Sequence, residues 1–132
     1  MTWYAAHLIE YFRLREGHQE KYPVWESVIL IQANSVGEAL DLAHQIGKEK
    51  YDATDDTWHL DDQPATKIFL GIRKIVECDL DDADSSPALG TEITYTKMEV
   101  NTEDEARRMA HGESVTVTME EVGRATRPDA NS

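Results

Sequence analysis

The chain has 132 residues, with 26 Asp and Glu against 13 Lys and Arg, so its formal net charge at pH 7 is -13. Such an acidic surface repels phosphate backbones and anionic lipids, which argues against direct nucleic-acid binding and against a membrane partner. With 40% hydrophobic residues, a chain of this length covers one modest core. We therefore expect a single α+β domain over residues 1–122 and a disordered tail over residues 123–132.

The first two β-prone runs predict an antiparallel hairpin. Residues 3–14 and 24–32 are rich in aromatic and β-branched residues, and a polar stretch that contains Gly17 separates them. Residues 28–31 are apolar without alternation, which is typical of a strand covered on both faces. The sequence therefore predicts that the second strand is central in its sheet.

A helix is predicted after this hairpin. Ser35 is placed as its N-cap, and Glu38 three residues later completes a capping box. Apolar residues follow at helical spacing through about Lys50, so this helix is expected to pack on the sheet. A polar connection over residues 52–64 comes next, with a short strand around Trp58.

The second half of the chain predicts further strands and a second capped helix. Apolar residues alternate from about Lys67 to Leu80, with Lys74 as the exception, and predict a strand with one apolar face. Residues 91–100 predict another strand. Thr102 and Glu105 form a second capping box that opens a short helix, and the alternating residues 115–119 predict a final strand.

The two predicted helices align with one another, since each begins with a capping box and continues with Ala and an apolar residue at the same spacing. A duplicated ββα unit explains this match and predicts a mainly antiparallel sheet with both helices packed on one face. Capping and packing requirements explain the same match without duplication. Both explanations stay open at this stage.

Four segments match, in order along the first hundred residues, the pattern of a small bacterial family. They are Trp3-Tyr4-Ala5-Ala6, residues 27–33 leading into Glu38-Ala39-Leu40 and Ala43, Phe69-Leu70-Gly71-Ile72 and residues 90–95 from Gly90 to Tyr95. On these segments the chain resembles the Domain of Unknown Function 4288 family. The resemblance supports the fold and implies no activity, cofactor or catalytic residue, and the segment from Thr102 onward extends beyond the family pattern.

The single cysteine and the N-terminus indicate the compartment. Because Cys78 is the single cysteine, the chain has no internal disulfide, which is compatible with a reducing cytoplasm. The apolar neighbours of Cys78 favour an inert buried thiol. The N-terminus lacks the pattern of a signal peptide, and no apolar stretch approaches the roughly 20 residues of a membrane helix. The sequence therefore predicts a soluble cytoplasmic protein.

Three acidic runs without Lys or Arg are the remaining candidates for chemistry. Asp82 and Asp84 have the spacing of a calcium loop, but Pro87 and Ile93 stand where its glycine and bidentate glutamate belong. The five histidines lack the paired spacing of a helical zinc site. We therefore predict solvated acidic loops, with no catalytic residue, metal ligand or cofactor.

The interpretation that the sequence supports is a non-enzymatic acidic interaction module that docks to a protein partner or self-associates. A basic protein is one candidate partner, a homodimer is another, and a divalent-cation or small-ligand binding domain is the alternative function. Trp58 is placed between polar loops as an exposed anchor, whereas Trp3 and Trp25 are assigned to the core of the hairpin. The predicted partner-binding residues are Trp58, Asp55, Asp56, Asp61 and Asp62.

Overall fold

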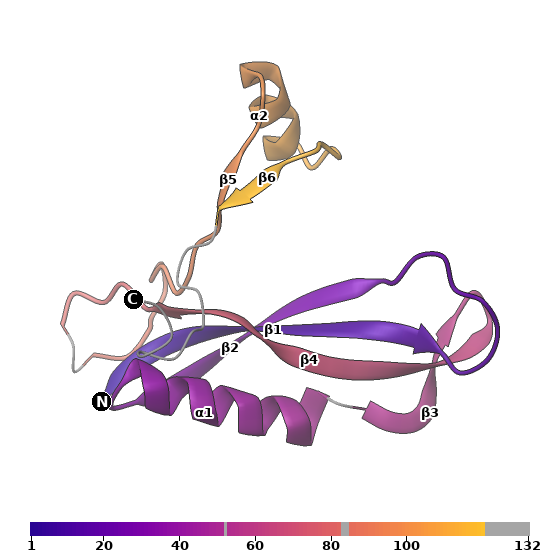
Figure 1. Cartoon of the computed structure of the whole chain (residues 1–132). Helices are drawn as coiled ribbons and strands as arrows, with labels where there is room; N and C mark the ends of the chain where they lie inside the picture. Colours follow the sequence, from indigo (N-terminus) through magenta and orange to yellow (C-terminus); the bar gives the residue numbers. More distant parts are fainter. Residues whose placement is uncertain (52, 83–84, 121–132) are drawn as a thin grey trace, which may run out of the picture.

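The computed structural model describes residues 1–51, 53–82 and 85–120, with residues 53–57 described by their backbone (Figure 1). It contains a long antiparallel sheet and one helix on a face of that sheet (Figure 1). Residues 97–120 form an arm on the opposite side of the sheet, labelled β5, α2 and β6 in Figure 1. The predicted α+β class is confirmed. The tail predicted over residues 123–132 lies outside the described residues.

The main sheet has four antiparallel strands in the order β2-β1-β4-β3. They are β1 (Thr2–Leu14), β2 (Val24–Ala33), β3 (Ala53–Leu60) and β4 (Gln63–Glu77). The predicted hairpin of β1 and β2 is confirmed, but β2 is an edge strand and the prediction that it is central is wrong. β1 takes the central place because β4 pairs with its other side.

Helix α1 (Val36–Ile46) begins where the sequence predicts it. The Ser35 hydroxyl accepts a hydrogen bond from the Glu38 backbone N–H at 3.1 Å, while the Glu38 carboxylate accepts one from the N–H of Asn34. In a standard capping box the carboxylate accepts from the backbone N–H of the N-cap residue, which is Ser35 here. In α1 it accepts from the residue before the N-cap, so only the first of the two predicted hydrogen bonds is present. A π-helical turn, η1 (Gly47–Tyr51), continues the helix toward β3.

The core lies between α1 and the sheet. It consists of the apolar side chains on one face of the three strands nearest the helix and of the buried stripe of α1, and its buried members are Tyr4, Ala6, Leu8, Ile31, Ala33, Ala39, Leu40, Ala43 and Ile75. Small residues on α1 let the helix approach the sheet closely, because alanine side chains add little bulk between two backbones.

β4 does not carry the single apolar face that its sequence predicts. Its pairing with β1 shifts register between His7 and Leu8 and again between Ile9 and Glu10. Each bulge reverses the face to which the following residues point, because side chains alternate along a strand. Gly71 lies at the second shift with a φ of 155°, a conformation that favours glycine.

The arm comprises β5 (Lys97–Glu99), α2 (Glu103–Ala110) and β6 (Thr118–Glu120). The predicted capping box of Thr102 and Glu105 is present, but α2 has no buried residue and stands away from the sheet (Figure 1). The prediction that both helices pack on one face is therefore wrong. The layout of a repeated ββα unit is also not reproduced, since β5 pairs with β6.

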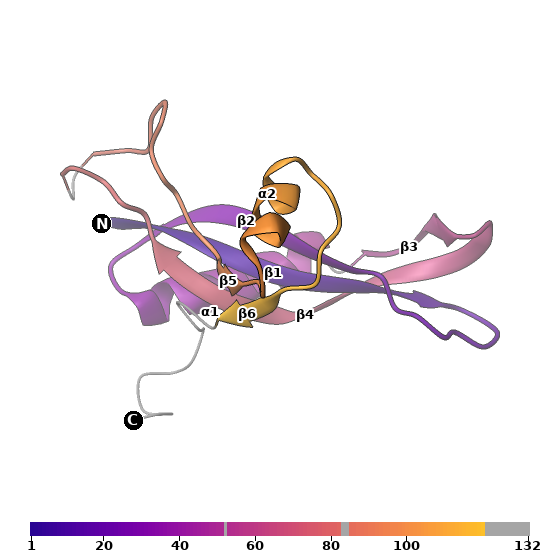
Figure 2. The ribbon, with the colours of Figure 1, turned by 90° about the horizontal axis from the view of Figure 1, so that it is seen from above.

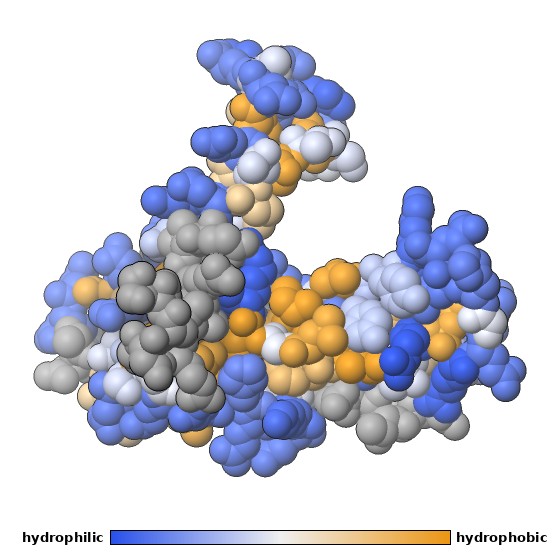
Figure 3. Space-filling view, in the orientation of Figure 1, coloured by the Kyte–Doolittle hydropathy of each residue, from blue (hydrophilic) through white to orange (hydrophobic). Residues whose placement is uncertain are grey.

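Two views show how the parts are arranged. Seen from above, the arm stands over the strands, and the β1–β2 loop and the β3–β4 turn lie together at the end of the sheet away from the N-terminus (Figure 2). We call this end the distal end. Apolar residues gather on the body of the sheet, whereas the visible surface of α1 and the outer end of the arm are mostly hydrophilic (Figure 3).

A glycine at the junction of α1 and η1 gives a test of the packing. A Cβ on buried Gly47 would lie inside the van der Waals distance of the Phe69 ring. We expect Gly47→Ala to lower the free energy of unfolding by about 1–3 kcal/mol, the usual cost of overpacking. Gly37→Ala, where nothing lies closer than 3.9 Å, is expected to be neutral or stabilising by up to about 1 kcal/mol. Urea denaturation measures both, and equal effects would contradict the close contact.

Candidate functional site

The turn at the distal end exposes two of the predicted site residues. Asp61 and Asp62 have positive φ angles of 49° and 66°, as in the two-residue hairpin turns that suit twisted strands. Asp tolerates this conformation better than most residues. Both side chains are exposed, so the carboxylates of this turn project into solvent beside the β1–β2 loop.

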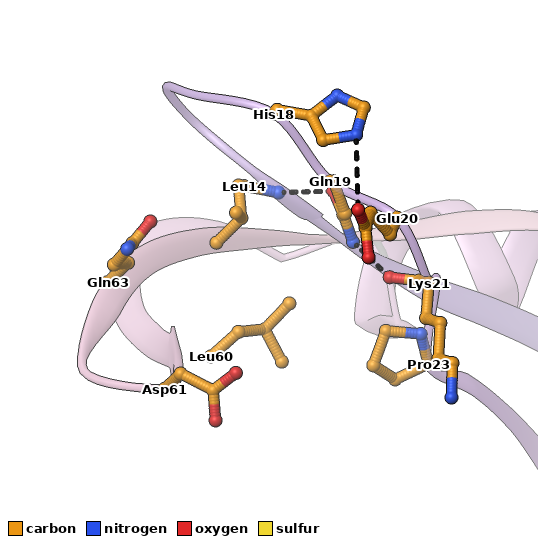
Figure 4. A pocket seen from close by; sticks show the side chains of 9 residues that line it. All are labelled: Leu14, His18, Gln19, Glu20, Lys21, Pro23, Leu60, Asp61 and Gln63. Atoms are coloured by element: carbon orange, nitrogen blue, oxygen red, sulfur yellow. Dashed lines mark hydrogen bonds and ion pairs between the residues drawn. The ribbon is translucent and has the colours of Figure 1, made fainter.

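A pocket of about 560 Å³ lies between that turn and the β1–β2 loop (Figure 4). We call it the distal pocket. The side chains of Leu14 and Leu60 point into it from two strands, and Pro23 adds to this apolar floor (Figure 4). Polar residues complete the lining, namely His18, Gln19, Glu20, Lys21, Asp61 and Gln63.

Gln19 holds the loop that forms one wall of the distal pocket. Its side-chain carbonyl accepts a hydrogen bond from the Leu14 N–H at 2.9 Å, and its amide donates to the carbonyls of Phe12 and Lys21 at 2.9 and 3.0 Å. A side chain that replaces backbone partners in this way orders a turn that lacks regular structure. The pocket is therefore fixed by the loop's own sequence.

Three aromatic rings pack next to the pocket, on the face of the sheet that carries α1. Trp25 and Trp58 meet edge to face with centroids 5.6 Å apart, and Phe12 lies 4.9 and 5.2 Å from them. Lys67 places its ammonium 5.1 Å from the Trp58 ring centroid and 5.4 Å from that of Tyr51. Trp58 thus already has a cation partner in its own chain.

The two tryptophans differ from their predicted environments. Trp58, the predicted exposed anchor, is half-buried, whereas Trp25, the predicted core residue, is 48% exposed. Trp25 is exposed because β2 is an edge strand, so that only one neighbouring strand, β1, lies beside it. Of the other predicted residues, Asp61 lines the distal pocket with Leu60, and Asp55 and Asp56 belong to β3, where their side chains lie outside the described part of the structure.

A buried polar cluster lies on the opposite face, under the connection from β4 to β5. His7 is 3% exposed, and its Nδ1 lies 2.7 Å from a Glu26 carboxylate oxygen that is also 3.3 Å from Arg73. Its Nε2 lies 2.6 Å from the Thr94 hydroxyl. Lys74, also fully buried, donates to the carbonyl of residue 95 at 2.5 Å and to the hydroxyl of residue 96 at 3.1 Å.

The chain of hydroxyl, imidazole and carboxylate in this cluster has the order of a hydrolase triad. Burial lowers the pKa of His7, which favours a neutral ring that donates to Glu26 and accepts from Thr94. The pockets at the distal end and along the connection after β4 are lined by neither His7 nor Thr94. We therefore assign a structural role to the cluster: it holds residues 94–96 against the sheet.

Sequence reasoning missed this cluster and also the buried carboxylate of Glu10. Glu10 is fully buried, and one of its oxygens accepts a hydrogen bond from the Ser27 hydroxyl at 2.9 Å, while the other has no hydrogen-bond partner in the described part of the chain. The sequence does carry a signal for these buried groups, namely polar residues that interrupt apolar runs. Glu10 and Lys74 both interrupt such runs, and an interruption of this kind predicts a buried polar group that needs a partner.

Neither a metal site nor a reactive thiol is found among the side chains of residues 1–51, 58–82 and 85–120. Within these ranges no three His, Cys, Asp or Glu residues are grouped to hold a metal ion, and the spacing of Asp82 and Asp84 lies partly outside them. Cys78 is buried, and burial followed by the nearby Glu77 raises the pKa of its thiol. No helix in these ranges is long and apolar enough to span a membrane.

The lowered pKa of His7 predicts a pH dependence. Since the folded-state pKa lies below the ordinary 6.5, the unfolded chain binds a proton more readily than the native one. The contribution of His7 is therefore fully present above about pH 6.5 and is lost as the pH falls toward the folded-state pKa. We expect the free energy of unfolding, measured in urea at about pH 7.5 and 5.5, to fall more in the wild type than in His7→Gln. Equal losses would contradict the assigned direction.

The hydrogen bonds of Lys74 predict how residues 94–96 are held. Lys74→Met keeps the stem and removes the ammonium, which leaves two oxygen acceptors without their donor. Since an unsatisfied buried group costs about 1–3 kcal/mol, we expect chymotrypsin to cleave after Tyr95 about tenfold faster. Lys48→Met, at an exposed position of η1, is the matched control. Unchanged cleavage in Lys74→Met would show that other contacts hold the segment.

Comparison with known proteins agrees with the resemblance seen in the sequence. The profile of a family described as Domain of unknown function (DUF4288) matches residues 3–95, which include all of the main sheet except Thr2, together with α1 and the Thr94 of the buried polar cluster. No curated protein and no solved structure matches the chain. Because the match covers more than half of its 132 residues, the chain belongs to the DUF4288 family.

Proposed function

We propose that the chain is a non-enzymatic protein-interaction module that receives a basic segment of a partner protein at its distal end. The distal pocket carries the proposal. Its floor of Leu14 and Leu60 is apolar, and the carboxylate of Asp61 lies at its rim. A lysine or arginine side chain divides in the same way, into an apolar stem and a cationic head.

The charge around the pocket favours the same partner. Residues 53–62 contain four Asp and no Lys or Arg, and they form β3 and its turn beside the pocket. Glu20 adds a further carboxylate to the rim, while Lys21 is the cation among the lining residues. An acidic edge of this kind steers a basic partner toward the pocket, and it raises the association rate more than it slows dissociation.

The remaining polar groups favour binding over catalysis. Catalysis needs a nucleophile or general base that substrate can reach. The triad-like arrangement in the described part of the chain centres on His7, which is 3% exposed and hydrogen-bonded on both ring nitrogens. The accessible carboxylates of the distal end, by contrast, lie in a turn suited to contact with another molecule.

The four aspartates of β3 and its turn provide the test. The variant Asp55→Asn, Asp56→Asn, Asp61→Asn and Asp62→Asn removes four charges without changing side-chain size. Affinity capture from the native lysate, eluted in steps of salt, is expected to yield a basic protein with the wild type and none with this variant. With the purified partner at low ionic strength, the association rate is expected to fall about tenfold or more.

A second variant controls for the loss of net charge. Asp41→Asn, Asp79→Asn, Asp81→Asn and Glu99→Gln also removes four charges, all at exposed positions away from the distal end. This control is expected to retain the partner and to lose little of the association rate. If both variants bind the partner as the wild type does, or both lose it equally, the acidic distal end is not the binding surface.

A further inference from the structure

The outer edge of β2 is the part of the sheet that the proposed function leaves unused. β2 stands at one end of the strand order, and in the described part of the chain no strand pairs with its outer side. An edge strand presents a row of backbone N–H and C=O groups that are ready to pair with another strand. The occupant that this chemistry selects is therefore a β-strand.

The side chains of β2 are also left partly uncovered. Val24, Val28 and Leu30 alternate along the face away from α1 and are 56%, 42% and 42% exposed. Residues 94–96 cover the neighbouring strands on this face, where they contact His7 and Lys74, and they leave this row open. On the other face of the same strand, Trp25 is 48% exposed.

The two edges of the sheet differ sharply in charge. β3, the opposite edge, contains Asp55 and Asp56, and charged residues on an edge are a usual protection against pairing. β2 has a single charged residue in its ten, Glu26, whose carboxylate is already paired with Arg73 at 3.3 Å. The sheet is therefore protected on one edge and open on the other.

We propose that β2 is a homodimer interface, in which the β2 strands of two copies pair antiparallel about a twofold axis. The second copy is favoured because β2 is complementary to itself. With Ile29 at the axis, Val28 of each copy faces Leu30 of the other, which joins the exposed apolar rows. The result is a continuous sheet of eight strands, twice the four of the main sheet in one chain.

Charge and side-chain size fit this register. Glu26 of one copy lies opposite Gln32 of the other, so that a carboxylate meets an amide and not a second carboxylate. Trp25 lies opposite Ala33, which pairs a large residue with a small one across the strands. Two chains of net charge -13 repel one another over most of their surfaces. β2 has a single charged residue, so two copies can approach along this strand with little repulsion.

The proposal is tested by the mass of the protein in solution. Sedimentation equilibrium of the full chain at about 100 μM is expected to give twice the 15.0 kDa of one copy. The variant Val28→Lys with Leu30→Lys places two ammonium groups in the paired row, and it is expected to raise the dissociation constant at least about 100-fold. Leu70→Lys, at a 61% exposed residue of β4, is the matched control and is expected to remain dimeric. Circular dichroism checks that each variant is folded.

Hydrogen exchange of the wild type tests the same interface without any substitution. Amides of β2 are expected to lose protection when the protein is diluted about 1000-fold, while those of β1 are expected to keep theirs. A monomeric wild type, a dimer that survives the two lysines, or β2 protection that does not change with dilution would each overturn the proposal. These measurements need no partner protein, and the four-Asn variant of β3 is expected to remain dimeric, so the two proposals fail separately.

Discussion

The arrangement of the whole molecule depends on the burial of two polar side chains beneath residues 94–96. Lys74 and His7 are almost completely shielded from water, and a buried ammonium is tolerated only where oxygen acceptors surround it. The acceptors of Lys74 come from residues 95 and 96, so the connection after β4 is held across the sheet at this point. This contact covers His7 on the second face of β1 and fixes where the arm departs from the sheet.

Covering the centre of the sheet in this way leaves its two edges for the two proposed interactions. The β3 edge is acidic and adjoins the distal pocket, whereas the β2 edge is apolar and nearly uncharged. Electrostatic attraction acts over about 8–10 Å at physiological salt, while strand pairing needs contact along the whole strand. The acidic edge is therefore suited to capturing a separate partner, and the apolar edge to a lasting interface between copies.

The features that the sequence predicts correctly are those with local signals. The hairpin of β1 and β2 follows from two β-prone runs, and α1 follows from Ser35 and a helical apolar stripe. The buried polar cluster joins His7 to Thr94, which are 87 residues apart, and no local pattern reports such a pair. The place of α2 was missed for a related reason. Its capping box specifies a helix, but it lacks the wide apolar stripe that would fix the helix to a sheet.

The wrong prediction for β2 has a physical reason that bears on the dimer. Apolar side chains at residues 28–31 indicate that both faces of the strand are to be covered, and the single chain covers one of them. A hydrophobic pattern reflects the environment of the assembled protein, because the sequence must suit every surface that is buried in it. In the proposed dimer β2 has a strand on each side and is therefore central, as its sequence predicts. The second face of β2 is shielded from the side, because Val28 and Leu30 of one copy lie next to Leu30 and Val28 of the other.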